Sequence, residues 1–285
     1  MVPLERTARI GFVGLGNLGL PMATALVRAG WPVTAYDVRR KAVDAAVAAG
    51  ADGADSLDAL AGCQVLALAV PDDETVTATL HAPKLLDRLA PDPVVLVHST
   101  VLPATARALG EAGRERALTF LDAPVSGGAE RAEQGTLTVM VGADEPALER
   151  AAPYLDTIAA DVVHVGPPGA GAAAKLANQL MMFAALAGTH EALRLAEAYD
   201  VDPKTALEVA HTSTGDSWVA REWGFFDRVT GAYDAADVPV HSRPWSKDLW
   251  EIVAAARAAR IQLPVAGLLS QTLADVVEGH ADTDR

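Results

Sequence analysis

The sequence predicts an α/β fold in which an N-terminal Rossmann domain, a doubly wound and largely parallel sheet, precedes an all-α C-terminal domain. Over the first 166 residues, short apolar runs alternate with Ala- and Leu-rich helical segments, the pattern of a parallel sheet covered on both faces. After "VGPPGAG" (165–171) only helical patterns follow. Since 285 residues exceed one small domain, we expect two, residues 1–166 and residues 167–285.

The N-terminal domain begins with a strand, a glycine turn and a helix over 18–29 that Gly30 closes. Apolar runs of four to eight residues are typical of buried strands. A further helical pattern occupies residues 39–50. The predicted strands are residues 8–13, 31–36, 64–70, 94–99, 118–124, 136–142 and 162–166.

The C-terminal domain is predicted to be entered through one long interdomain helix. Proline and glycine punctuate residues 166–169, which places the boundary there. The helices that we expect beyond it are residues 170–197, 203–211, 216–228, 244–259 and 264–279.

Composition excludes several classes of partner. Lys and Arg total 23 against 37 Asp and Glu, a net charge of −14, whereas nucleic acids and anionic membranes attract basic surfaces. A small anionic substrate stays compatible, because the local charges of a pocket decide its binding. The seven histidines show no metal-ligand spacing such as H-E-x-x-H, so no metal is expected.

The chain reads as a cytoplasmic protein. The single cysteine, Cys63, allows no internal disulfide, and the mixed-charge N-terminus does not resemble a secretion signal. The longest apolar stretch contains Lys175, Asn178 and Gln179, a trio that a bilayer-spanning helix rarely accepts.

Three glycines, Gly14, Gly16 and Gly19, form G-x-G-x-x-G between the first strand and the first helix. In a dinucleotide site the first glycine allows a tight turn, the second admits the pyrophosphate, and the third lets helix pack on strand. A purely structural turn is the alternative. The acidic residue that ends the second strand favours the dinucleotide, so residues 14–19 are predicted to bind the cofactor, with Leu15, Asn17 and Leu18 between the glycines.

Asp37 is that acidic residue. Its carboxylate can accept the hydroxyls of the adenosine ribose and would repel a 2′-phosphate, which favours NAD over NADP. Arg39 and Arg40 follow closely, and a guanidinium there could instead hold a phosphate. Solvated cations at a helix start are the alternative for both, so NADP stays possible.

Lys175 and Asn178 are three residues apart and share one face of the long helix. An apolar environment lowers the pKa of a lysine toward the range useful for proton transfer. Alternatively, the stem of Lys175 lies on apolar surface while the ammonium reaches water. Helix spacing does not decide between the two.

Other strand ends offer ligand-binding positions, since doubly wound sheets bind ligands there. Ser126 with Gly127 and Gly128 supplies a hydroxyl and bare backbone amides, which suit a carboxylate. In the helical half, Lys247 provides a cation beside Asp248. The remaining strand ends carry Val70 and Pro71, and Ser99 and Thr100.

Together these motifs resemble the β-hydroxyacid dehydrogenases, which include 3-hydroxyisobutyrate dehydrogenase and tartronate semialdehyde reductase. "GFVGLGNLGLPMA" looks like the cofactor signature and "DAPVSGG" like the substrate signature. "GAGAAAKLANQ" looks like the catalytic signature, and "KDL" like the C-terminal contact. The four motifs occur in order over nearly the whole chain.

The resemblance implies a role for each residue. Lys175 is then the general acid/base and Asn178 helps to place the substrate, while Ser126, Gly127 and Gly128 hold its carboxylate. Lys247 closes over cofactor and substrate. The residues expected along the nicotinamide half are Val70, Pro71 and Thr100. The family is also commonly dimeric or tetrameric, and its reaction interconverts a β-hydroxyacid with the semialdehyde or ketone.

Three rivals stay open. Imine reductases share the architecture but usually lack a lysine at the position of Lys175. 6-Phosphogluconate dehydrogenases share the lysine–asparagine helix, yet their chains are much longer. A non-catalytic NAD-binding protein would predict a damaged pocket, whereas Lys175, Asn178 and Ser126 are all present.

Overall fold

A computed structural model describes residues 2–82 and 85–283 of the chain. The chain forms two compact units, residues 1–175 and 176–285. In neither unit does a described helix have the length and apolar character needed to cross a membrane.

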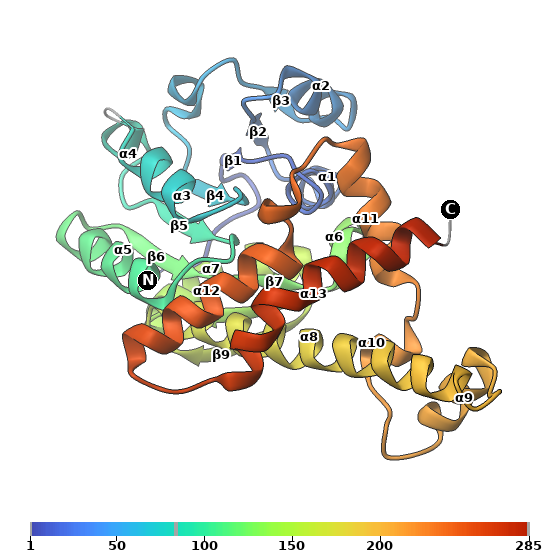
Figure 1. Cartoon of the computed structure of the whole chain (residues 1–285). Helices are drawn as coiled ribbons and strands as arrows, with labels where there is room; N and C mark the ends of the chain where they lie inside the picture. Colours follow the sequence, from blue (N-terminus) through green and yellow to red (C-terminus); the bar gives the residue numbers. More distant parts are fainter. Residues whose placement is uncertain (1, 83–84, 284–285) are drawn as a thin grey trace. The chain divides into compact units, whose positions relative to one another are not determined.

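The first unit contains one sheet of strand order β3-β2-β1-β4-β5-β6-β8-β7, with β9 paired to β8 (Figure 1). Strands β1 to β6 pair in parallel, as predicted, whereas β8 runs antiparallel to β6 and β7. Sequence patterns do not predict the two-residue strands β3 and β7, because these strands are too short to show an alternating pattern. The strands are β1 Ile10–Val13, β2 Val33–Tyr36, β3 Asp52–Gly53, β4 Val65–Leu68, β5 Val94–Val97, β6 Thr119–Asp122, β7 Val125–Ser126, β8 Leu137–Gly142 and β9 Ala159–Gly166.

Both faces of this sheet are buried at the central strands β1, β4, β5 and β6, which explains their continuous apolar runs. In β4, Val65 and Ala67 belong to one core cluster and Leu66 and Leu68 to the other, as a period of two requires. Helices α1, α2 and α7 cover the first face, and α3, α4 and α5 cover the second. The helices of this unit are α1 Gly19–Arg28, α2 Arg40–Ala48, η1 Leu57–Leu60, α3 Asp73–Leu80, α4 Leu85–Arg88, α5 Pro103–Glu115, α6 Gly128–Gln134 and α7 Glu145–Ile158.

The second unit is helical, and the described residues after β9 contain no strand. Its core surrounds Phe183 and Trp245, which are at most 1% exposed. The single helix predicted over 216–228 is wrong: Gly224 takes φ +84°, outside helical geometry, and separates α10 from α11. The helices are α8 Ala170–Glu197, which begins in the first unit, α9 Pro203–His211, α10 Trp218–Arg221, α11 Phe225–Ala235, η2 Val240–Ser242, α12 Pro244–Ala259 and α13 Pro264–Thr283.

Arg243 ties three helices of this unit together. Its guanidinium, with a side chain only 6% exposed, donates to Asp234 of α11 at 2.6 Å and to Glu278 of α13 at 2.7 Å. The other carboxylate oxygen of Glu278 accepts the indole N–H of Trp245 at 2.8 Å. The network satisfies its buried polar groups, and removal of one member leaves the others without compensation.

We therefore expect Arg243→Ala to lower the free energy of unfolding by about 3–5 kcal/mol. Chemical denaturation followed by tryptophan fluorescence measures the change. The control is Arg221→Ala, because Arg221 pairs with Asp216 at an exposed site, where ion pairs contribute little. Equal stabilities of the two variants would contradict a structural role for the Arg243 network.

Candidate active site

The candidate site follows the carboxyl edge of the parallel strands. Strand β1 pairs with β2 on one side and with β4 on the other, so the order in which successive strands join the sheet reverses there. Open α/β sheets bind their ligands at such a switch point, beyond the carboxyl ends of the strands. The segments at the ends of β1, β2, β4, β5 and β7 carry nearly all the residues that the sequence singles out in this unit.

The glycine turn after β1 is closely packed at two of its three glycines. Gly14 takes φ +93°, and a Cβ on it would lie 2.4 Å from the carbonyl oxygen of Ala69, after β4. A Cβ on Gly19 would lie 1.9 Å from the carbonyl oxygen of Gly14. These two glycines are required by the fold itself.

Gly16 is different, because no protein atom lies within 4 Å of the position that its Cβ would take. Neither packing nor a left-handed φ explains a glycine there. The motif reserves this position for the close approach of a pyrophosphate. The open space therefore fits a dinucleotide, and a structural turn leaves it unexplained.

Asp37, directly after β2, holds the glycine turn from the other side. One carboxylate oxygen accepts the backbone N–H of Leu15 at 2.7 Å, and the other accepts that of Arg39 at 2.8 Å. The Arg39 guanidinium also binds this carboxylate, at 3.1 and 3.3 Å. Burial raises the pKa of Asp37, but these hydrogen bonds outweigh it, so the pKa is lowered and the group is an anion.

The loops after β4 and β5 meet beside the glycine turn. The hydroxyl of Ser99 accepts the backbone N–H of Val70 at 2.9 Å, which places Val70 next to the segment that ends in Thr100. The exposed Pro71 follows. His98 then connects the ends of β5 and β6: its Nδ1 donates to the carbonyl of Ala123 at 2.8 Å, and its Nε2 accepts the hydroxyl of Tyr154.

Ser126, Gly127 and Gly128 form a half-buried turn between β7 and α6. Gly127 takes φ +139° and Gly128 takes φ +74°, a backbone that side chains with a Cβ adopt only with strain. The Ser126 hydroxyl and the backbone amides of the two glycines have no bulky side chain within this turn beside them. A carboxylate is the ligand that such donors suit.

Lys175 lies on α8, whose start is fixed at this same edge. The carboxylate of Asp122, the last residue of β6, accepts the backbone N–H groups of Gly169 and Ala172, each at 2.8 Å. Lys175 follows one helical turn later and is 8% exposed. This burial disagrees with the interpretation that its ammonium simply reaches bulk water.

Asn178 and Lys247 belong to the second unit. Asn178 is half-buried, one turn beyond Lys175 on α8. Lys247 Nζ lies 3.0 Å from Asp248 and 2.8 Å from Glu251, on its own helix α12. Burial lowers the pKa of Lys247, but the carboxylates of Asp248 and Glu251 together raise it by more. The net shift of the pKa is therefore upward, and the lysine stays charged.

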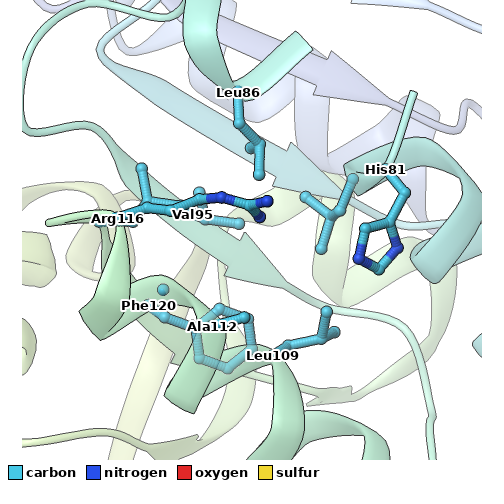
Figure 2. A pocket seen from close by; sticks show the side chains of 10 residues that line it. His81, Leu86, Val95, Leu109, Ala112, Arg116 and Phe120 are labelled. Atoms are coloured by element: carbon cyan, nitrogen blue, oxygen red, sulfur yellow. The ribbon is translucent and has the colours of Figure 1, made fainter. Parts of the chain in front are cut away.

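A small hollow of the first unit lies away from this edge (Figure 2). His81 follows α3 and Arg116 follows α5, and both helices begin at the carboxyl edge and run back toward the amino ends of the strands. The rest of the lining is apolar and consists of Leu80, Leu86, Val95, Leu109, Ala112, Gly113, Leu118 and Phe120. Its position and its apolar lining separate it from the cofactor residues.

Sequence reasoning missed several residues of the site. Asp122 is an acidic residue that ends an apolar strand, and that contrast was a usable signal. Glu251 lies four residues after Lys247, the spacing of a helical ion pair. By contrast, Gln179 donates to Asp248 at 2.6 Å across 69 residues of sequence, and no local pattern predicts such a contact.

Two family models match the chain. Residues 9–166 match the NAD binding domain of 6-phosphogluconate dehydrogenase, and residues 169–285 match the model described as NAD-binding of NADP-dependent 3-hydroxyisobutyrate dehydrogenase. The first alone spans more than half of the chain. The dinucleotide-binding fold predicted for the N-terminal half agrees with the first match.

Among its relatives, the chain is 38% identical to an NAD-dependent L-serine dehydrogenase of Pseudomonas aeruginosa, covering 97% of this chain and 95% of the relative. It is 36% identical to a 3-hydroxyisobutyrate dehydrogenase of the same organism, covering 96% and 93%. A solved structure of Mycobacterium tuberculosis 3-hydroxyisobutyrate dehydrogenase with L-serine superposes with a TM-score of 0.81 at 30% identity, covering 97% and 96%. The fold, the order of the motifs and these full-length matches lead to one conclusion: the chain belongs to the β-hydroxyacid dehydrogenase family.

Proposed function

We propose that this protein oxidises the primary hydroxyl of a small β-hydroxyacid such as L-serine or 3-hydroxyisobutyrate, or catalyses the reverse reaction, with Lys175 as general acid/base. The activity class, an NAD(P)-dependent β-hydroxyacid dehydrogenase, follows from the family and from the named relatives. Both acids named carry a CH₂OH group on the carbon next to the carboxylate. The observation that carries the proposal is the buried Lys175 at the cofactor edge of the sheet.

The cofactor is assigned to the residues at this edge. Backbone amides of the glycine turn, residues 14–19, would bind the pyrophosphate, and Asp37 would accept the adenosine ribose hydroxyls. The open space at Gly16 supports the first assignment. Val70, Pro71 and Thr100 are proposed along the nicotinamide half, where the loops after β4 and β5 meet. When bound, the nicotinamide supplies a hydride acceptor or donor.

Lys175 would exchange the proton of the substrate hydroxyl at its Nζ atom. In the oxidation direction Nζ removes the proton from the hydroxyl oxygen, and in the reduction direction it returns the proton to the forming alkoxide. General acid–base catalysis of this kind contributes about 10²–10⁴-fold to the rate. Burial of the side chain excludes bulk water from this exchange.

Substrate binding is assigned to the remaining residues of the motifs. The Ser126 hydroxyl and the amides of Gly127 and Gly128 would hold the carboxylate. Asn178 is proposed to orient the substrate, and the charged Lys247 to contact substrate and cofactor. The network of Lys247 with Asp248 and Glu251 keeps its ammonium protonated for such a role.

Initial rates with NAD⁺ and NADP⁺ test the proposal. The panel contains L-serine, 3-hydroxyisobutyrate, glycerate, 3-hydroxypropionate, 4-hydroxybutyrate and threonate, with a cyclic imine as the arm for imine reduction. We expect turnover of at least one β-hydroxyacid and none of the imine. NADH binding without turnover of any acid would reject the proposal in favour of a non-catalytic NAD-binding protein.

We further propose that NAD⁺ is preferred and that Asp37 sets this preference. Asp37→Asn removes the anion that repels a 2′-phosphate and releases the Arg39 guanidinium, which can then bind that phosphate. We expect the ratio of kcat/KM for NADP⁺ over that for NAD⁺ to rise by about 100-fold, equivalent to ~2.7 kcal/mol. Arg40→Ala is the control, because Arg40 pairs with Asp44 and Asp55 instead. An unchanged ratio in Asp37→Asn would show that Asp37 does not select the cofactor.

We propose that the protein is a homo-oligomer, a dimer or a tetramer, that assembles through its helical unit. Most of the exposed large apolar side chains among the described residues lie there. Exposed apolar surface of this kind marks interfaces. The examples are Met181, Leu195, Tyr199, Val209, Trp218, Trp250 and Leu268. Light scattering on the purified protein gives the assembly size.

We place the functional boundary between residues 166 and 167, with cofactor binding before it and substrate and assembly roles after it. The gap between the two family matches supports this position. Division by contacts instead falls at residues 175 and 176, since the first turn of α8 is tied to β6 through Asp122. We also propose a cytoplasmic location, where the buried thiol of Cys63 stays reduced.

A further inference from the structure

Asp122 is a buried carboxylate that the mechanism above does not use. It ends β6, is 0% exposed, and lies within the segment that resembles a substrate-binding signature. Its Oδ1 accepts the N–H of Gly169 and its Oδ2 accepts the N–H of Ala172, both at 2.8 Å. These N–H groups belong to the start of α8, where a helix has no internal acceptors for them. Asp122 thus binds the helix that carries Lys175, and not a ligand.

Two glycines make room for this contact. A Cβ on Gly142, at the end of β8, would lie 2.4 Å from Oδ1 of Asp122. A Cβ on Gly171 would lie 2.5 Å from the carbonyl oxygen of Asp122 and 2.6 Å from that of Met140. The first turn of α8 therefore lies directly against the ends of β6 and β8, and its position depends on the atoms of Asp122.

A contribution to the stability of the fold does not explain why position 122 carries an ionisable carboxylate. Burial raises the pKa of Asp122 to about 6, although backbone N–H groups of Gly169 and Ala172 act against this shift. Because the folded pKa is above the unfolded value of 3.8, the folded state binds a proton more tightly. The contribution of Asp122 to stability is therefore largest below pH 4, falls between pH 4 and 6, and stays low above pH 6. At neutral pH the ionised group disfavours folding.

We propose that Asp122 is a positioning residue for catalysis, which fixes the first turn of α8 and thereby the placement of Lys175 one turn later. This inference rests on the proposed function of Lys175. The ionised carboxylate accepts with both oxygens, whereas a protonated one turns one oxygen into a donor. One N–H of the first turn then loses its acceptor, and the turn moves. A misplacement of about 1 Å in a catalytic group reduces turnover by as much as about 100-fold.

The elements packed around Asp122 carry other titratable groups. His98, at the end of β5, has a pKa lowered to about 4 by burial, and burial raises the pKa of Tyr154 on α7. Both are neutral near pH 6. The Cβ of Arg107 of α5 lies 3.5 Å from the position that a Cβ on Gly169 would take, and Nε2 of His164 of β9 donates to the carbonyl of Ala143 at 2.8 Å. Lys175 is the remaining titratable group. It is the proposed base and is present in every variant, so His164 is the group whose contribution to a pH profile has to be excluded by substitution.

The experiment uses the full-length protein, NAD⁺ and the most active acid of the panel. We expect Asp122→Asn to lower kcat at pH 8 by about 10- to 100-fold, while Kd for NADH changes less than twofold and Tm by only a few degrees. Below pH 6 the wild-type kcat should fall more steeply than that of Asp122→Asn, because protonation of the proposed base Lys175 lowers both, whereas protonation of Asp122 lowers only that of the wild type. His164→Gln should keep the wild-type profile. Lowering the pH from 7 to 5 should also raise the wild-type Tm relative to that of Asp122→Asn.

Asp144→Asn is the matched control, because Asp144 precedes α7 without a side-chain bond to its N–H groups; its kcat should equal that of the wild type. Two results would overturn the positioning role: a kcat of Asp122→Asn within threefold of wild type, or a loss of kcat that only follows a loss of folded protein. If Asp122→Asn does not fold, a wild-type kcat that is flat from pH 5 to 8 overturns it. Absence of any wild-type turnover rejects the proposed function and this inference together.

Discussion

Lys175→Met should reduce kcat for β-hydroxyacid oxidation by about 10²–10⁴-fold, the contribution that a general base makes to such a step. Methionine preserves the length and the apolar stem of the side chain, and Lys175 is only 8% exposed, so the variant should fold. Kd for NADH should stay within threefold of wild type, because the dinucleotide residues are untouched. Steady-state rates and NADH fluorescence titration measure the two quantities.

The control for this prediction is Lys204→Met, an exposed lysine on α9, which should keep the wild-type kcat. If Lys175→Met kept a kcat within tenfold of wild type, with Kd for NADH unchanged, Lys175 would not be the general acid/base. A loss of NADH binding together with kcat would point to a cofactor-binding role instead. The two quantities therefore separate the assignments.

Gly16→Val should raise Kd for NADH by about 100-fold or more, equivalent to at least ~2.7 kcal/mol, while Tm stays near that of wild type. The reason is geometric. No protein atom lies within 4 Å of a Cβ on Gly16, so the fold accepts the side chain, which then occupies the space assigned to the pyrophosphate. Fluorescence titration gives Kd, and thermal melting gives Tm.

Two matched variants sharpen this test. Gly267→Val adds a side chain at another glycine with no atom within 4 Å of its Cβ position, and should change neither Kd nor Tm by much. Gly19→Ala places a Cβ 1.9 Å from the carbonyl oxygen of Gly14 and should lower Tm strongly. If Gly16→Val bound NADH as wild type does, the open space at Gly16 would not be the cofactor site.

Local patterns in the sequence predict much of the fold. Buried apolar runs predict the parallel strands β1, β2, β4, β5 and β6. The glycine motif predicts where the first helix begins. The antiparallel β7 and the two-residue β3 are invisible to such patterns, since their pairing depends on neighbours distant in sequence. The break at Gly224 cannot be predicted from the glycine alone, because Gly188 and Gly231 lie inside helices α8 and α11. The left-handed φ that ends helical geometry at Gly224 is defined only by the folded chain.

The candidate site likewise has residues that the sequence predicts and contacts that it does not. The sequence singles out Gly14 and Gly16 because they belong to one short motif, and Asp37 because it is the acidic residue that ends the second strand. It does not reveal that Asp37 binds Arg39 and the turn, nor that Asp122 caps α8, because both depend on backbone groups whose positions only the folded chain defines. Long-range polar contacts such as Gln179 with Asp248 have no counterpart in sequence spacing.

Transfer of deuterium tests the central claim most directly. With L-[3,3-²H₂]serine, or the correspondingly labelled acid that the panel shows to be turned over, and NAD⁺, we predict that the reduced cofactor carries one deuterium by mass spectrometry. The hydroxyl-bearing carbon would then be the source of the hydride. Reduced cofactor formed without deuterium would contradict the account, because the hydride would have come from another position.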